Sequence, residues 1–145
     1  MTKYSAADAD KWADKFDAIL DAITKQATND MLNSIDISVG IARGGSRVRG
    51  TIPRDLGALA GSLQSTLYGG TPISSVGEDS YELVVGRMHA GDKALFTWGG
   101  SAAPYARAVH YGVGSLQGTF WRDIAAAGWG GYVEGATRKA KAIIR

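Results

Sequence analysis

An apolar repeat with a spacing of three and four residues runs through Trp12-Ala13-Asp14-Lys15-Phe16-Asp17-Ala18-Ile19-Leu20-Asp21-Ala22-Ile23. Residues three and four apart share one face of an α-helix, so this spacing predicts an amphipathic helix with an apolar side. The same period continues through Ala27 and Met31. The rest of the chain has to fold around this helix.

The expected helix is long. Ser5 followed by Asp8 has the pattern of a capping box, so we expect the helix to run from Ala6 to about Asn33. At ~1.5 Å per residue it would be about 40 Å long, which is more than a domain of this size covers alone. We expect most of its apolar side to be buried within the subunit. The alternative is that part of the helix packs on a neighbouring subunit.

Further elements follow along the chain. Short helices are expected from Asp55, as N-cap, to Leu63 and from Tyr105 to Tyr111, where Gly112 ends the helix. We expect a C-terminal helix over Trp129 to Ile144. Alternating and β-branched residues predict strands, listed here by number: 63–68, 81–87 and 94–98. The expected fold is therefore α+β, with a central antiparallel sheet of three or more strands between a long N-terminal helix and a C-terminal helix.

Length and composition indicate one domain over residues 1–145. With no cysteine, the chain has no disulfide, no thiolate zinc site and no cysteine nucleophile. No apolar run approaches the ~20 residues of a membrane-spanning helix, so we expect no membrane contact. The acidic N-terminal segment does not have the pattern of a secretory signal, and we expect synthesis in a cytoplasm.

Charge is unevenly distributed. Residues 1–36 carry four lysines against seven aspartates, whereas residues 40–51 combine four glycines with three arginines. We expect a flexible Gly/Arg-rich arm or loop at about 40–52. Arginine side chains are suited to bind carboxylates and phosphates. We therefore expect the arginines of this arm, and the next arginine along the chain, to contact a partner protein or DNA: Arg43, Arg47, Arg49 and Arg54. In an isolated monomer they would only solubilise the loop.

No catalytic signature is present. The chain lacks phosphate-binding and dinucleotide glycine loops, zinc-protease motifs and the nucleophile elbow of hydrolases. His89 and His110 are too few for a three-histidine metal site, and no spacing singles out a carboxylate pair. We therefore expect no enzyme, no cofactor and no bound metal. Aromatic residues beside glycines are candidate interface anchors, although Trp12, Trp98 and Trp121 are expected to be buried.

Two short motifs carry a family resemblance. One is a Pro-x-Asp-Thr-Gly-x-Leu-x-x-Ser segment, matched here by Pro53, Asp55, Gly57, Leu59 and Ser62. The other is Tyr-Ala-x-x-Val-Glu-Tyr/Phe-Gly, matched by Tyr105, Ala106, Val109, Tyr111 and Gly112. At these motifs the chain resembles the minor neck proteins of long-tailed bacteriophages, the head-tail connector or tail-completion family. It departs from the family pattern at Leu56 and His110, which stand in place of a threonine and a glutamate.

The resemblance implies a structural virion protein of the phage neck. Such a protein would form a ring of about six or twelve subunits that completes the tail or the head and enables head-tail joining. Its partners would be other copies of itself and portal, stopper, tail-terminator or tail-tube proteins, with transient DNA contact in the channel. The motif residues would be interface positions. Two alternatives stay open, a tail terminator that caps the tail tube and a small nucleic-acid-binding or host-interaction module.

Overall fold

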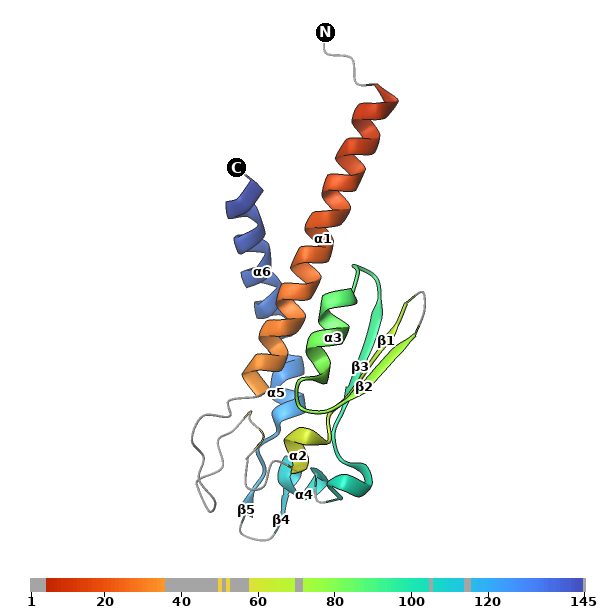
Figure 1. Ribbon diagram of the computed structural model, residues 1–145. Coiled ribbons are helices and arrows are strands. Elements are labelled where there is room, and N and C mark those ends of the chain that lie inside the picture. The colour runs from red at the N-terminus through yellow and green to blue at the C-terminus, as the bar shows by residue number, and fades with distance from the viewer. Residues whose placement is uncertain are drawn as a thin grey trace.

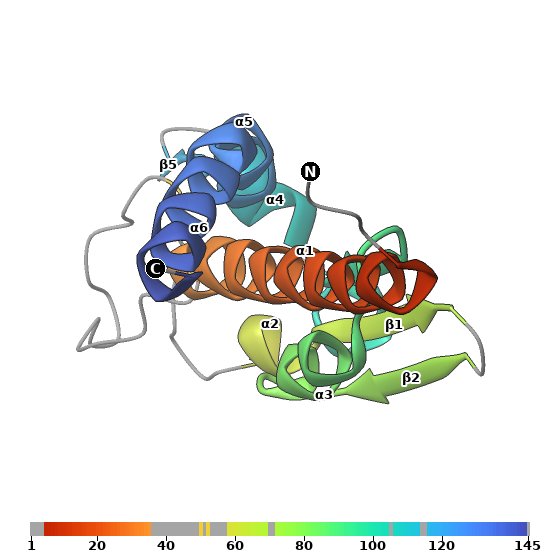
Figure 2. The same cartoon turned by 90° about the horizontal axis from the view of Figure 1, so that it is seen from above.

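The computed structural model describes residues 5–35, 50, 52, 58–69, 72–104, 106–113 and 116–144. It confirms the α+β class, with a long N-terminal helix, a three-stranded antiparallel sheet, short helices and a C-terminal helix (Figure 1). Seen from above, α1 lies between α5 and α6 on one side and α3 with the sheet on the other (Figure 2). Helix α1 is therefore packed on two opposite sides, by α5 and α6 on one and by α3 on the other.

The N-terminal helix α1 spans Ala6–Ile35, which confirms the predicted bounds to within two residues. Its first turn is closed by the expected capping box. The backbone N–H of Ser5 donates to Asp8 Oδ2 at 3.1 Å, and the backbone N–H of Asp8 donates to Ser5 Oγ at 3.2 Å. The 30-residue helix is about 45 Å long at its ordinary rise.

The C-terminal helix α6 spans Trp129–Ile144, as the sequence predicts, and runs antiparallel beside α1 (Figure 1). Ala136 is buried at the contact, and Lys139 Nζ lies 3.7 Å from Asp30 Oδ2 on α1.

The sheet has the order β2-β1-β3, with β1 (Gln64–Tyr68) in the centre. The predicted strands over 63–68 and 94–98 are confirmed as β1 and β3 (Lys93–Thr97). The remaining strand, β2 (Ile73–Val76), has no counterpart in the sequence prediction. Ser65 and Leu67 of β1 face inward, as the period of two requires.

The predicted strand over 81–87 is wrong, because this segment forms helix α3 (Ser80–Arg87). Val84 and Val85 favour strands by intrinsic propensity. However, the buried residues of the segment are four apart, Ser80 with Val84 and Tyr81 with Val85, which is the spacing of a helix face. The helix covers the inner face of the sheet, and burial there outweighs propensity.

Short elements complete the fold: α2 (Ala58–Gly61), a 3-10 turn (Gly100–Ala102), α4 (Ala106–Tyr111), β4 (Gly112–Val113), β5 (Leu116–Gln117) and α5 (Trp121–Ala127). Gly112 ends α4 with a φ of +90°, which confirms the predicted stop. Helix α5 is not predicted from the sequence. Helix α2 was predicted to begin at Asp55, which lies outside the described residues.

Two groups of buried side chains form the core. The larger one joins α1, α2, α3, α4 and α5, and includes Leu32, Leu59, Tyr81, Val109 and Trp121. The smaller one lies between α3 and the sheet and consists of Leu67, Val84 and Met88. Among the described helices, none is long and apolar enough to cross a membrane.

Candidate functional site

The N-terminal half of α1 projects away from the sheet and α3, and its end extends beyond every other helix and strand (Figure 1). Its large apolar residues are exposed to increasing degrees toward the N-terminus, 37% for Leu20, 52% for Phe16 and 71% for Trp12. We call these three residues the apolar stripe. The expectation that Trp12 is buried is therefore wrong, and the expected burial of the apolar side holds only toward the C-terminal end, where Ala27 is buried and Met31 is partly buried. The physical reason is that the buried residues of α1 begin only at Ala27, where neighbouring elements cover the helix.

The N-terminal half of α1 and the helix α6 carry charges of opposite sign. From residue 6 to residue 20, α1 carries four aspartates and two lysines. Helix α6 carries three exposed basic residues, Arg138, Lys139 and Lys141, and a single acidic residue, Glu134. The molecule thus has an acidic projecting helix and a basic C-terminal helix. The two surfaces therefore carry charges of opposite sign.

A second candidate site surrounds His110 near the end of α4. The imidazole is 4% exposed and makes edge-on contacts with three aromatic rings. Its ring centroid lies 4.6 Å from that of Tyr111, 5.6 Å from that of Phe120 and 4.7 Å from that of Trp121. Trp98 on the chain after β3 meets Trp121 at 6.3 Å. Three separate segments of the chain therefore supply one aromatic cluster.

A close backbone contact positions this cluster. The N–H groups of Thr119 and Phe120 donate to the carbonyls of Val109 and His110, both at 3.0 Å, which satisfies the open end of α4. Gly118 makes the approach possible, because a Cβ there would collide with the backbone of α4. Phe120 then adopts a φ of +51°, an uncommon conformation for a non-glycine residue, and turns the chain into α5.

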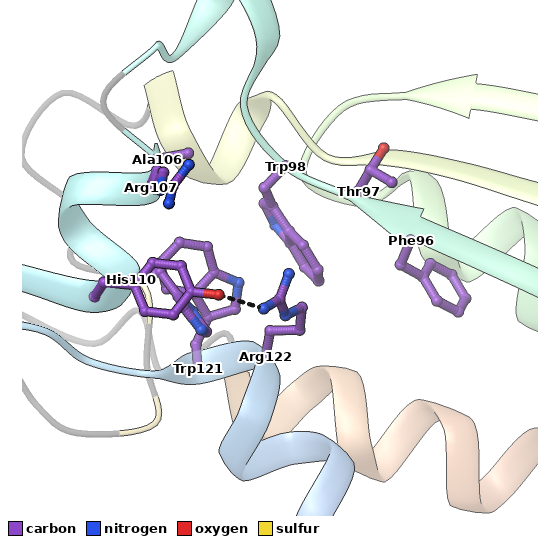
Figure 3. Close-up of a pocket in the computed structure, with 9 residues that line it drawn as sticks. Phe96, Thr97, Trp98, Ala106, Arg107, His110, Trp121 and Arg122 are labelled. Carbon is purple, nitrogen blue, oxygen red and sulfur yellow. Dashed lines mark hydrogen bonds between the residues drawn. The ribbon is translucent and has the colours of Figure 1, made fainter.

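The cluster lines a pocket of about 470 Å³ (Figure 3). Phe96, Trp98, His110 and Trp121 form much of its wall, and Arg107 and Arg122 bring cations to it from α4 and α5. Figure 3 shows the side chains of Trp98 and Arg122 converging on the same space. A pocket of this size is in the range that binds small molecules or single side chains of a partner.

Hydrogen bonds hold one of the two arginines in place. Arg122 Nη2 donates to the hydroxyl of Tyr111 at 2.9 Å, and Arg122 Nε donates to Asp123 Oδ1 at 3.2 Å. His110 Nε2 lies 3.4 Å from Asp123 Oδ2, within ion-pair range but without hydrogen-bond geometry. Burial raises the pKa of the Asp123 carboxyl, but Arg122 and His110 outweigh this effect, so its pKa lies below its ordinary value.

Several buried polar atoms of the pocket have no partner among the described residues. They are Nδ1 of His110 and the indole Nε1 of Trp121, and His110 Nε2 makes no hydrogen bond beyond its 3.4 Å approach to Asp123 Oδ2. Buried donors and acceptors are nearly always paired in folded proteins, so such atoms mark a place where a ligand group or water completes the structure. These atoms lie behind the apolar wall and not on the open surface of the pocket.

The sequence-predicted site residues separate into three groups. His110, Tyr111 and Gly112 lie at the end of α4, where His110 is buried and Tyr111 is half exposed. Leu59 is buried in the core. The others lie outside the described residues: Arg43, Arg47, Arg49, Arg54, Asp55, Gly57 and Tyr105.

Sequence reasoning missed two pocket residues, Arg107 and Arg122. Neither arginine belongs to a recognisable sequence motif. Only the unpredicted helix α5 brings Arg122 to Tyr111. Trp121 was expected to be buried, which is confirmed, and Trp98 is partly buried. The adjacent aromatics Phe120 and Trp121 were the one available signal for this region.

Within the described part of the chain, no group of three or more histidine, aspartate or glutamate side chains is placed to hold a metal ion. Comparison of the chain with protein-family models, with curated proteins and with solved structures gives no match in any of the three.

Proposed function

We propose that this protein is a non-enzymatic structural subunit of a tailed-phage neck, which assembles with copies of itself into a ring that completes the tail or head for joining. The observation that supports this proposal most is the apolar stripe of Trp12, Phe16 and Leu20 on the projecting half of α1. A row of large apolar residues on one helix face, left exposed in the isolated chain, is typical of an interface with another protein.

The stripe provides apolar area for association. Fully burying a large apolar side chain contributes about 1.5–3 kcal/mol, and the gain is smaller for Phe16 and Leu20, which are already partly covered. Aromatic residues such as Trp12 and Phe16 are also the ones that most often dominate binding free energy. Burial of all three side chains therefore offsets much of the entropy lost when two subunits associate.

The charges indicate how copies are arranged. The acidic projecting half of α1 complements the basic face of α6, and the two surfaces are different parts of the molecule. An interface between two different patches is heterologous, and repeating it closes into a ring when the rotation between neighbours allows. We propose that the apolar stripe of one copy packs beside α6 of the next.

We propose that the Gly/Arg-rich segment at about 40–52 makes a contact that is separate from the one between subunits. It lies outside the described residues, so its role rests on the sequence and on the resemblance to neck proteins. In a ring, Arg43, Arg47 and Arg49 repeat around a central opening and add up to a strong positive field. We propose that they contact a portal, stopper or tail protein, or the DNA in the channel.

Reconstituted head-tail joining tests the proposal. Heads and tails of a phage that encodes this protein, assembled without it, are mixed with the purified protein, and infectious particles are counted. Wild-type protein is expected to restore joining. A triple variant with Trp12→Gln, Phe16→Gln and Leu20→Gln, which keeps good helix formers in α1, is expected to fold but not to restore it.

The matched controls are Leu83→Gln on α3 and Leu95→Thr on β3, whose residues are 41% and 47% exposed and lie outside the stripe. Both are expected to restore joining. Full joining by the folded triple variant would contradict the proposal. Capping of isolated tail tubes would identify a tail terminator instead, and retention of the monomer on DNA at ~0.2 M salt would identify a nucleic-acid-binding module.

A further inference from the structure

The pocket beside His110 is not explained by ring formation, because the apolar stripe lies on the far half of α1. Its wall is largely aromatic, and the indole Nε1 of Trp121 is buried behind that wall with no hydrogen-bond partner among the described residues. The pocket thus offers an aromatic surface and space for an apolar group.

The charge at the pocket is also unbalanced. Arg122 is paired with Asp123, whose side chain is half exposed. Arg107 contacts the Tyr111 ring, with its Cζ 5.8 Å from the ring centroid, and pairs with no carboxylate among the described residues. As far as the described residues show, the guanidinium of Arg107 is therefore available at the pocket, and a guanidinium binds a carboxylate through two parallel hydrogen bonds.

We propose that this pocket binds a short peptide segment of a partner protein that carries a carboxylate next to a bulky apolar side chain. The apolar side chain fills the space beside Trp98 and Trp121, and the carboxylate pairs with Arg107. The binding site is separate from the apolar stripe, so it does not depend on the proposed function.

A nucleic acid fits the pocket less well. Phosphodiester backbones are bound by several cations along an open surface. Here the charge of Arg122 is offset by Asp123. This leaves Arg107 to meet an anion in the described pocket, and the carboxylate of Asp123 would repel a second negative charge. A singly charged carboxylate matches that balance.

Two small probes that differ in one group test the carboxylate. N-acetyl-phenylalanine has a phenyl ring, a carbonyl and a carboxylate, and its amide has the same groups without the charge. The chain has four tryptophans. In protein labelled with 5-fluorotryptophan, each gives one fluorine resonance, and the Trp121→Phe variant identifies that of Trp121. The acid is expected to shift the Trp121 resonance at concentrations about fivefold to tenfold lower than the amide.

Arg107→Gln is expected to remove this preference, so that acid and amide bind within about twofold of each other. Arg87→Gln, an exposed arginine on α3, is the matched control and is expected to keep it. Equal binding of acid and amide to the wild-type protein would overturn the proposal, as would an unmoved Trp121 resonance with both. A larger shift with adenosine monophosphate than with the acid would also overturn it.

Discussion

Asp21 on α1 accepts a hydrogen bond from the backbone N–H of Ala90 with an N–O distance of 2.7 Å. The second carboxylate oxygen of Asp21 lies 2.8 Å from His89 Nδ1, and one turn further Lys25 Nζ donates to the Gly86 carbonyl at 3.1 Å. These contacts fasten α1 to the end of α3 and the turn before β3. They lie next to Leu20, where the apolar stripe begins, so the projecting half of the helix extends from a fixed point.

The Asp21 contact makes stability depend on pH. The N–H of Ala90, and then His89, hold the pKa of the Asp21 carboxyl below its ordinary value of 3.8. A carboxyl with a lowered pKa in the folded state stabilises the fold above its unfolded pKa, and this stabilisation is lost as the pH falls through the folded pKa. We predict that Asp21→Asn lowers the melting temperature at pH 7 and that the difference from wild type shrinks below about pH 4.

Melting curves recorded between pH 7 and pH 2 check this prediction. Asp10→Asn is the control, because Asp10 is exposed on the same helix. The control is expected to match wild type throughout. A melting-temperature difference for Asp21→Asn that is absent at pH 7 would show that this contact does not hold α1.

Gly118 is predicted to tolerate no side chain. Because an added Cβ meets the backbone at the end of α4, Gly118→Ala is expected to cost about 3 kcal/mol or more of the free energy of unfolding. Gly135→Ala on α6 has open space around the new methyl group, and is expected to stabilise by about 0.5–1 kcal/mol. Urea unfolding measures both. Equal stabilities for the two variants would mean that the close approach to α4 is absent.

The capping box is predicted to act locally. Ser5→Ala removes the side-chain acceptor of the first turn, which costs about 1 kcal/mol of helix stability. Because this end of α1 projects from the body, we expect faster hydrogen exchange in its first two turns and an unchanged melting temperature. Ser74→Ala on β2 serves as control. A large drop in melting temperature for Ser5→Ala would imply that the projecting half is part of the cooperative core.

Charge reversal tests the proposed neighbour contact. The double change Asp14→Lys and Asp17→Lys on α1 is expected to weaken self-association, and so is Arg138→Glu with Lys141→Glu on α6. Lys139 is left unchanged because it pairs with Asp30 inside the subunit. Combining all four changes restores opposite charges and is expected to recover association, as sedimentation velocity would show. Failure of the combination to recover it would place the contact elsewhere.

Helix α1 and the end of α4 were predictable because local signals agree with the final structure. The spacing from Trp12 to Met31 and the Ser5 cap determine α1, and Gly112 ends α4. The valines at 84 and 85 misled the prediction of a strand, because the buried face of α3 is set by its packing on the sheet. That packing partner is distant in sequence.

Neither the exposure of the apolar stripe nor the existence of the pocket beside His110 was predictable, because both depend on residues that are distant in sequence. An apolar helix face has the same pattern whether it packs on its own subunit or on another, so Trp12 could not be placed from sequence. Arg107 and Arg122 meet at one pocket only because the chain reverses at Gly118 and enters α5. No spacing in the sequence encodes that meeting.

The mass of the native assembly tests the central claim most directly. Native mass spectrometry of the wild-type protein is expected to give one closed species at an integral multiple of the 15.2 kDa subunit. Loss of the apolar stripe is expected to weaken association by more than about a hundredfold and to leave monomers. A wild-type protein that stays monomeric up to its solubility limit, or a triple variant that assembles as the wild type does, would contradict the account.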